Sequence, residues 1–336
     1  MKIVSVFLHY DYGIKSRGET PEYQKGGFYA AFCQLGYAVY PFWWDDYLAD
    51  KNMLQKKLIQ YVDGIKPDIV FFILMRDEFS FETLSYLKSK YITINWFWDD
   101  QWRFDDFTKY YAPYFTYSIT TDKFSLAKYR NIGYKNVILI RPASYDCYRE
   151  LDFAKIQYKY DVSFVGGKSA YREWIARQLQ KNNIKVQCFG HGWPAGPISY
   201  TEMAEVFKTT RINLNISNSV SHDIRYIFSS RRSLKEFLKS PKRLEQLKQR
   251  NFEIPAFGGF QLTNYVPSLE DYFDIGREIA IYTGVDDLLL QVRYYLENED
   301  KRKMVMIGGY RKVFNNGPTY VDRFRDIFSL IRAKSL

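Results

Sequence analysis

Short apolar runs alternate with longer amphipathic stretches along the first part of the chain, and the same alternation then starts again. In the first part the runs cover residues 3–8, 38–42, 69–74 and 92–96, and in the second part 161–165, 184–189, 212–216 and 279–282. Strands that alternate with helices are typical of parallel sheets with helices on both faces. The pattern therefore predicts an α/β chain with two doubly wound, Rossmann-like domains.

The boundary between the two domains is expected in residues 143–160, which lack a clear period and carry mixed charge. We expect an N-terminal domain over residues 1–150 and a C-terminal domain over residues 151–315. The last amphipathic stretch, 319–331, predicts a terminal helix within residues 316–336.

Composition excludes several classes of protein. No apolar run reaches the ~18 residues that a spanning helix needs, and the apolar start of the chain breaks at His9, before it could form a signal-peptide core. The sequence therefore predicts a cytoplasmic protein. Cys33, Cys147 and Cys188 are widely spaced, which disfavours disulfides and structural zinc. The net charge of +10 favours an anionic partner such as nucleic acid, acidic lipid or a phosphorylated small molecule.

A glycine turn follows the first predicted strand of the second domain. Gly166, Gly167 and Lys168 come directly after that strand, and Arg172 lies in the first turn of the next predicted helix. Free backbone N–H groups and the positive end of a helix dipole bind phosphate at such junctions, and the two basic side chains add full charges. The spacing matches neither a Walker loop nor G-x-G-x-x-G. The turn predicts either a pyrophosphate site or an ordinary tight turn.

Two more glycine-rich turns occur in this domain. Gly190 and Trp193 lie in the turn after the next strand, and Gly258 and Gly259 follow a short helix that contains Glu253. A carboxylate in that position can accept hydrogen bonds from both hydroxyls of a ribose while backbone amides hold phosphates. The alternative is that Glu253 is a surface charge at the start of a helix.

Several motifs are spread over nearly the whole chain. They are Tyr10-Asp11-Tyr12-Gly13 with Glu22-Tyr23, Trp96-Phe97-Trp98-Asp99-Asp100, Thr120-Thr121-Asp122-Lys123, Asp161-Val162-Ser163-Phe164-Val165-Gly166, Arg250 with Phe252-Glu253-Ile254-Pro255-Ala256 and Gly258-Gly259, and Gly276 with Glu278-Ile279. In this order they resemble the CgeB-like, or spore-maturation-protein-like, glycosyltransferases. The resemblance implies the GT-B fold, in which two Rossmann-like domains face each other across a cleft and the C-terminal helix packs back toward the N-terminal domain. It also implies an acceptor mainly on the N-terminal domain, a nucleotide diphosphate sugar mainly on the C-terminal domain, and no metal or cofactor.

The resemblance assigns roles to residues of the second domain. Related enzymes grip the diphosphate with a basic pair, which Lys168 and Arg172 match, and hold the donor with two glutamates spaced E-x7-E. Glu253 resembles the second glutamate, and Glu245 has the spacing of the first, although its neighbours predict an exposed helix. Arg250 would be a third cation for the leaving diphosphate. The predicted donor site comprises Gly166, Gly167, Lys168, Arg172, Gly190, Trp193, Asn215, Arg250, Glu253, Gly258 and Gly259.

Carboxylates also follow strands of the N-terminal domain. Asp11 lies in the loop after the first strand and Glu22 lies close to it in the sequence. Open α/β sheets bind ligands at this edge, and a carboxylate there could orient or deprotonate an acceptor hydroxyl. Asp11, Glu22 and Glu245 are therefore the candidate catalytic residues. Asp99 and Asp100 end another strand, and helix capping explains them equally well.

The segment between Asn218 and Arg250 contains many basic residues and few acids. It predicts either a solvated helical hairpin or a surface for anionic lipid or a polyprenyl-diphosphate acceptor. In the second interpretation Tyr226, Phe228 and Phe237 would be interfacial anchors.

The function predicted from the sequence is metal-independent transfer of a sugar from a nucleotide diphosphate sugar to a hydroxyl of a glycan, lipid-linked or protein acceptor. The expected context is polysaccharide biosynthesis. The expected partners are the nucleotide sugar, that acceptor and an anionic membrane surface, and not nucleic acid. Two alternatives stay open: a DNA-modifying glucosyltransferase, which the positive charge would suit, and a non-catalytic protein that binds nucleotide sugars. Retention or inversion at the anomeric carbon also stays open.

Overall fold

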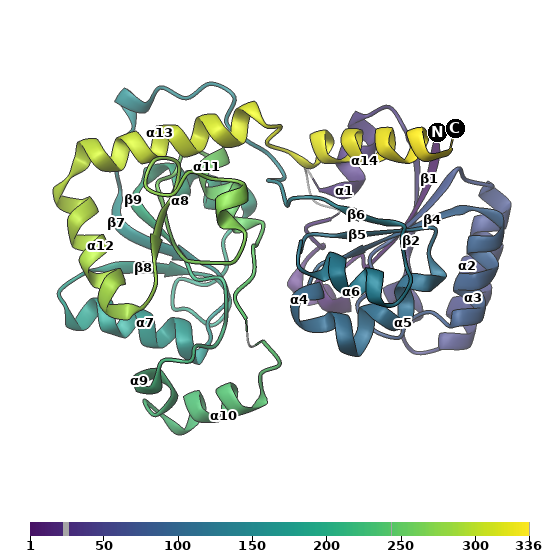
Figure 1. Cartoon of the computed structure of the whole chain (residues 1–336), viewed down its shortest axis with the longest axis horizontal. Coiled ribbons are helices and arrows are strands. Elements are labelled where there is room, and N and C mark those ends of the chain that lie inside the picture. The colour runs from purple at the N-terminus through teal and green to yellow at the C-terminus, as the bar shows by residue number, and fades with distance from the viewer. Residues whose placement is uncertain (23–26, 243, 336) are drawn as a thin grey trace. The chain divides into compact units, whose positions relative to one another are not determined.

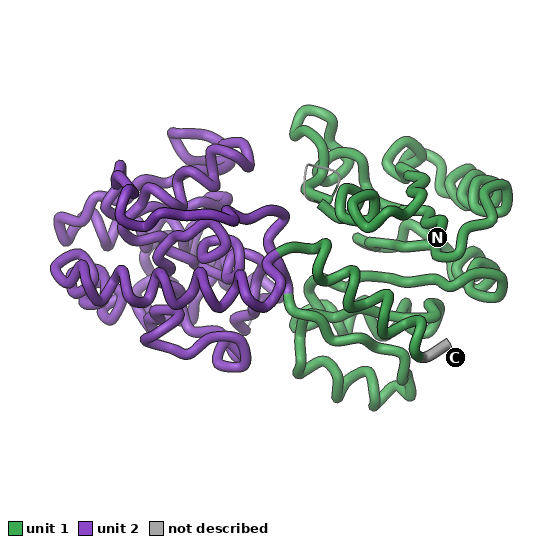
Figure 2. The backbone as a smooth tube through the Cα atoms, turned by 90° about the horizontal axis from the view of Figure 1, so that it is seen from above, with its two compact units in different colours: residues 1–141, 319–336 green, residues 142–318 purple. Residues whose placement is uncertain are grey.

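The computed structural model describes residues 1–22, 27–242 and 244–335, and the chain divides into two compact units (Figure 2). Unit 1 contains residues 1–141 and 319–336, and unit 2 contains residues 142–318. The chain thus leaves unit 1 once and returns to it at its end. No helix in the described ranges is long and apolar enough to cross a lipid bilayer.

Unit 1 is built on a sheet of six parallel strands in the order β2-β1-β3-β4-β5-β6. Since β1 pairs with both β2 and β3, consecutive strands are added on opposite sides of β1. The crevice at the carboxyl ends of β1 and β3 is therefore the switch point at which such sheets bind ligands. The strands are β1 (Lys2–Phe7), β2 (Ala38–Trp43), β3 (Ile69–Phe72), β4 (Ile92–Phe97), β5 (Tyr117–Thr120) and β6 (Val137–Leu139).

Helices cover both faces of this sheet because successive side chains of a strand point to opposite sides. On β3, Phe71 contacts the rings of Phe28 in α1 and Phe324 in α14, while Phe72 belongs to the core cluster that contains Leu58 of α2 and Leu84 of α3. The helices are α1 (Phe28–Gln34), α2 (Lys51–Ile65), α3 (Phe81–Lys90), α4 (Asp100–Arg103), α5 (Lys109–Tyr111), α6 (Ser125–Asn131) and α14 (Tyr320–Ser335).

The terminal helix α14 packs against α1, so the expectation that it returns to the N-terminal domain is confirmed (Figure 1). Phe324 and Phe328 of α14 contact the ring of Phe32 at centroid distances of 4.4 and 5.8 Å. These apolar side chains are four residues apart and so lie on one face of the helix.

Unit 2 is built on a sheet of five parallel strands in the order β11-β10-β9-β7-β8. Strand β7 lies between β8 and β9, so the switch point of this sheet lies at the carboxyl ends of β7 and β9. The strands are β7 (Tyr160–Val165), β8 (Val186–Phe189), β9 (Thr210–Asn215), β10 (Gln261–Asn264) and β11 (Ala280–Tyr282).

The core of unit 2 also has two sides. Phe164 packs in a cluster with Leu179 of α7 and Leu288 of α12, whereas the neighbouring Val165 packs against a cluster with Phe207 of α8 and Ile254 of α11. The helices are α7 (Ala170–Lys181), α8 (Tyr200–Thr209), α9 (Ile224–Ile227), α10 (Arg231–Lys239), α11 (Arg250–Ala256), α12 (Val285–Glu297) and α13 (Glu299–Asn315). In Figure 1, α9 and α10 lie below α7, apart from the sheet.

Candidate functional site

Arg172 joins the two segments that leave the switch point of unit 2. Its Nη1 donates to the carbonyl oxygen of Gly167, after β7, and its Nη2 donates to that of Ile216, after β9, each at 2.9 Å. Burial, helped by the charge of Arg250, lowers the pKa of Arg172 to about 10. Two guanidinium groups therefore share this edge of the sheet, an arrangement that an anion would stabilise.

Two buried donors at the same edge have no hydrogen-bond partner among the described residues. They are the Nε of Arg172 and the Nδ2 of Asn215, the last residue of β9. Buried polar groups are normally hydrogen-bonded. An oxygen-rich ligand at this edge would satisfy both.

The second cation, Arg250, is held by Glu253 one turn further along α11. Its Nη1 lies 2.8 Å from Oε2 of Glu253, and Gln249 donates from Nε2 to the other carboxylate oxygen at 2.7 Å. Glu253 is only 4% exposed, so it is not the surface charge that one interpretation of the sequence suggested. A ribose hydroxyl that bonds to this carboxylate must share it with Arg250 and Gln249 or displace one of them.

Glu245 also lies at this edge, and the prediction of an exposed helix around it is wrong. Residues 244–248 form neither helix nor strand, and Leu247 packs into a core cluster with Phe252, which draws the segment inward. Ser217 donates from Oγ to the Glu245 carboxylate, and Asn264 bonds to Ser217 in turn. Burial raises the pKa of Glu245, against the hydrogen bonds from Ser217 and Asn264. Arg243, in the same predicted helix, lies outside the described residues.

The glycine turns after β7 and β8 are joined to each other. The N–H of Gly166 donates to Phe189 at 2.9 Å, and the Gly166 carbonyl accepts from Trp193 Nε1 at 2.9 Å. A Cβ on Gly190, which has a φ of 127°, would meet the oxygen of Gly166 at 2.4 Å. Only glycine allows so close an approach. Trp193 therefore positions the turn that carries Lys168.

Gly258 and Gly259, predicted for the donor site, are packed tightly inside unit 2. Both are buried, and a Cβ on Gly258 would meet Leu151 at 2.0 Å. A Cβ on Gly259 would meet atoms of Asn213 and Phe207 at 2.8 Å. The two glycines allow α11 and β10 to pack closely against the rest of unit 2.

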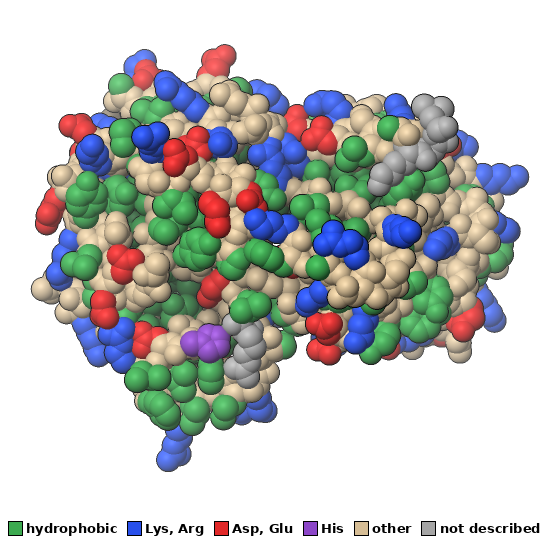
Figure 3. Space-filling view, viewed as in Figure 1, with side chains coloured by type: hydrophobic (Ala, Val, Ile, Leu, Met, Phe, Trp, Pro, Cys, Tyr) green, Lys and Arg blue, Asp and Glu red, His purple; other side chains and the backbone are tan. Residues whose placement is uncertain are grey.

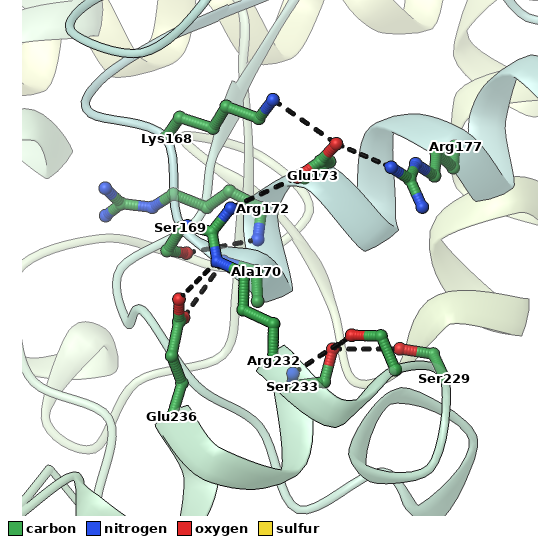
Figure 4. A network of polar contacts seen from close by, with 11 residues as sticks. Lys168, Ser169, Ala170, Arg172, Glu173, Arg177, Ser229, Arg232, Ser233 and Glu236 are labelled. Carbon is green, nitrogen blue, oxygen red and sulfur yellow. Dashed lines mark hydrogen bonds and ion pairs between the residues drawn. The ribbon is translucent and has the colours of Figure 1, made fainter.

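Carboxylates hold Lys168 and the amino end of α7 (Figure 4). Lys168 Nζ lies 3.3 Å from an oxygen of Glu173, and the N–H of Ala170 donates to Glu236 of α10 at 3.0 Å. Arg232 lies between the two acids, 2.8 Å from Glu236 and 3.7 Å from Glu173. The groups expected to bind a diphosphate thus already contact carboxylates of the chain itself.

Sequence reasoning missed Glu173 and Glu236. Each forms an ion pair with an arginine four residues away, Glu173 with Arg177 at 2.6 Å and Glu236 with Arg232. Such i,i+4 pairs on a helix are the signal that could have found them. Asn264, which bonds to Ser217, carries no comparable signal.

In unit 1, Asp11 and Glu22 lie close to each other near the end of β1. Burial raises the pKa of Glu22 to about 7, and the charge of Asp11 adds to this. Asp11 lies 3.7 Å from Arg17, and Asp45 fixes the loop by accepting from the N–H of His9 at 2.9 Å. A carboxylate that titrates near neutral pH is suited to accept a proton. Tyr23, of the same motif, lies outside the described residues.

The other acids of unit 1 differ in their surroundings. Asp100 is buried and accepts hydrogen bonds from Thr108 Oγ1 at 2.7 Å and Tyr129 OH at 2.8 Å. Burial raises its pKa to about 6, so it is part of the internal hydrogen-bond network of unit 1. Glu78, after β3, was not singled out in the sequence. It is 7% exposed, burial raises its pKa, and one of its oxygens has no partner in the described part of the chain.

Metal ligands do not gather within the described ranges. No group of three or more His, Cys, Asp and Glu side chains in residues 1–22, 27–242 and 244–335 could hold a metal ion.

Known proteins resemble this chain in part of its sequence and in its fold. Residues 172–329 match a family model described as glycosyl transferase-like, and no curated protein matches the chain. Sucrose-phosphate synthase from Thermosynechococcus elongatus superposes with a TM-score of 0.65 over 99% of both chains, at 10% identity. HepE from Anabaena, in complex with UDP and glucose, superposes with a TM-score of 0.63 over 98% of this chain and 99% of its own, at 10% identity. A glycosyltransferase from Rickettsia africae gives 0.58 over 97% and 96%, at 12% identity.

These likenesses show the fold: two Rossmann-like domains with parallel sheets, as in GT-B glycosyltransferases. The predicted fold class is confirmed. The family match adds that residues 172–329, in the second half of the chain, are similar to glycosyl transferases.

Proposed function

We propose that this chain is a CgeB-like GT-B enzyme that transfers a sugar from a nucleotide diphosphate sugar to a hydroxyl acceptor, and that unit 2 binds the donor. The observation that carries the proposal is the convergence of two arginines and two glutamates at the switch point of β7 and β9. Arg172 and Arg250 supply guanidinium groups, which suit phosphate oxygens. Glu245 and Glu253 supply carboxylates, which suit the hydroxyls of a sugar and a ribose.

Two further findings support a nucleotide sugar as donor. The buried, unpartnered donors of Arg172 and Asn215 would find acceptors in phosphate oxygens. HepE, which shares the fold, forms a complex with UDP and glucose. Glu253 would bind the ribose and Glu245 the sugar.

The chemistry assigned to these residues needs no metal. The bond between the anomeric carbon and the diphosphate oxygen breaks, and the nucleoside diphosphate leaves with the electron pair. Arg172, Arg250 and Lys168 would stabilise the charge that develops on it. The acceptor oxygen forms the new bond, and its proton passes to a carboxylate. We assign the acceptor to unit 1 and the proton to Glu22, whose pKa of about 7 suits this role.

The proposal also includes a class of acceptor. We propose a hydroxyl of a glycan or of a lipid-linked sugar, with polysaccharide synthesis as the context. The basic composition alone would also suit a nucleic acid. Duplex DNA that competes with the acceptor and protects the protein in a salt-dependent way would support the DNA-modifying alternative instead.

Ligand-induced thermal stabilisation tests the donor site. A nucleoside diphosphate at a hundredfold excess over its Kd should stabilise the wild type by about 2.7 kcal/mol. Glu253→Ala should lose most of that shift, whereas Glu297→Ala, which removes an exposed glutamate of α12 in the same unit, should keep it. An undiminished shift in Glu253→Ala would exclude the ribose assignment.

Turnover in the presence of a chelator tests metal independence. With three basic side chains on the leaving group, transfer should continue in EDTA at an undiminished rate. Complete loss of turnover that magnesium restores would contradict this part of the proposal. Donor binding without hydrolysis or transfer would support the non-catalytic alternative.

A further inference from the structure

Helix α10 has two faces with different surroundings. On the inner face Ser233 is buried and Phe237 packs against the core of unit 2. On the outer face Leu234 and Leu238, four residues apart and therefore one above the other, are 36% and 64% exposed. The helix thus keeps apolar side chains in water although its inner face is already packed.

The exposed apolar strip continues onto α9, which contacts α10. Ile224 begins α9 and Phe228 follows its last residue, and they are 69% and 77% exposed. Figure 3 shows hydrophobic side chains gathered over this part of unit 2. Of the three anchors predicted from the sequence, only Phe228 is exposed. Tyr226 is fully buried and Phe237 is partly buried against the core, so these two predictions are wrong.

Basic side chains border the strip. Arg231, Lys235 and Lys239 are exposed and form no ion pair within the described part of the chain. In contrast, Arg225 of α9 and Arg232 of α10 form ion pairs with carboxylates. The three cations next to the apolar strip are therefore available for an anionic partner.

The chemistry of this surface favours a lipid bilayer over nucleic acid. A duplex would use the three cations but would gain nothing from exposed leucine, isoleucine and phenylalanine side chains. A bilayer with anionic headgroups uses both, because apolar side chains enter the interface while lysine and arginine remain at the charged surface. A solvated hairpin needs no exposed apolar strip.

We propose that the α9–α10 surface docks unit 2 on an anionic lipid bilayer. The surface consists of Ile224, Phe228, Arg231, Leu234, Lys235, Leu238 and Lys239. None of these residues belongs to the donor site proposed above. The inference therefore goes beyond the transfer reaction, and its test does not depend on whether that proposal holds.

Sedimentation of the full chain with vesicles tests the docking. We expect the wild type to sediment with vesicles of phosphatidylcholine and phosphatidylglycerol, and not with phosphatidylcholine alone. Arg231→Gln, Lys235→Gln and Lys239→Gln should each weaken binding about fivefold, and together roughly a hundredfold. Leu234→Ser with Leu238→Ser should weaken binding at high salt, where the electrostatic part is screened.

A matched control separates this surface from the general positive charge of the chain. Lys181→Gln, Lys185→Gln and Lys301→Gln remove the same charge from exposed positions of unit 2 outside the surface, and this variant should bind vesicles nearly as well as the wild type. Equal weakening of the two triple variants would overturn the proposal, as would a wild type that does not bind anionic vesicles. Self-association of the wild type without vesicle binding, abolished by Leu234→Ser and Leu238→Ser, would replace the bilayer with a second copy of the chain.

Thermal unfolding shows whether each variant used in the vesicle experiment is still folded. All substituted side chains are exposed, so thermal unfolding of each variant should match that of the wild type. A variant with unchanged unfolding and lost vesicle binding supports docking. A charge variant with unchanged unfolding and unchanged vesicle binding contradicts it.

Discussion

Unit 1 and unit 2 share one architecture, but Asp100 of unit 1 has different surroundings from Glu173 and Glu253 of unit 2. In unit 2, Glu173 and Glu253 form ion pairs with Lys168 and Arg250 near the switch point. In unit 1, Asp100 is held by the hydroxyls of two neighbouring side chains. Both sheets are parallel and doubly wound, so the fold alone does not decide this difference.

The difference shows in the pKa values. Burial raises the pKa of Glu22 to about 7 and that of Asp100 to about 6. Although partial burial acts in the opposite direction, Lys168 and Arg177 lower the pKa of Glu173. Burial and a neighbouring negative charge favour the protonated carboxylate, whereas a paired cation keeps a carboxylate ionised. Under the proposed function, the first kind of carboxylate would serve the acceptor hydroxyl and the second would lie beside the cations that bind the diphosphate.

The strongest test of this contrast is Glu22→Gln. If Glu22 is the base, turnover should fall by about 10²–10⁴-fold. In the wild type kcat/KM should rise as the pH passes through about 7, because a base must be ionised. The variant should lose this rise, and Glu19→Gln, in the same loop, should keep it. A variant with the same pH profile as the wild type would exclude Glu22 as the base.

Arg172→Met tests the cationic side of the contrast. Removing the guanidinium from the switch point should lower turnover by about 10²–10³-fold, as expected for the loss of a group that stabilises developing charge. Arg177→Met removes an exposed arginine from the same helix and should have a much smaller effect. If steady-state kinetics showed the same loss of turnover in both variants, Arg172 would have no specific role in stabilising the leaving group.

Asp100 predicts a pH-dependent stability in unit 1. Asp100→Ala should lower the free energy of unfolding by about 3 kcal/mol, since it leaves two buried hydroxyls without their acceptor. The folded protein binds the proton more tightly than the unfolded chain, with a pKa of about 6 against 3.8, so stability should fall as the pH rises through that window.

Denaturant unfolding between pH 4 and pH 7 measures this effect. Asp100→Asn should make the fall in stability smaller, since Glu22 and other buried acids supply the rest, and Asp106→Asn, at an exposed position, should leave it unchanged. An Asp100→Asn variant with the pH dependence of the wild type would contradict the assignment.

The smallest expected effect concerns Glu236, which contacts the amino end of α7. If a donor diphosphate binds there, Glu236→Gln should raise nucleoside diphosphate affinity by about two- to fivefold, because a competing negative charge is removed. Calorimetry with Glu297→Gln as the control measures the change. Weaker binding in Glu236→Gln would mean that this carboxylate supports the site and does not compete for it.

Much of the fold and part of the site could be predicted from the sequence. The apolar runs located β1 to β4, β7 to β9 and β11, because a parallel strand that is covered by helices on both faces is apolar along its length. The residues directly after β7 could also be anticipated, since the carboxyl ends of parallel strands share one edge. The helix predicted around Glu245 is absent. Its charged residues suggested a solvated face, but Leu247, one of the two leucines of the segment, is buried and anchors the segment to the core.

Local order along the chain was therefore determined by the sequence itself: two α/β domains, their strand order along the chain, and a glycine turn followed by basic residues. Tertiary structure alone decided which charges meet. Glu236 lies 66 residues from Ala170, and Ser217 lies 28 residues from Glu245. The pattern of apolar residues along the sequence predicts whether a side chain is buried, but it does not predict which distant residue that side chain contacts. The strength of a charge interaction depends on distance and surroundings in space, so these partners emerge only when the chain is folded.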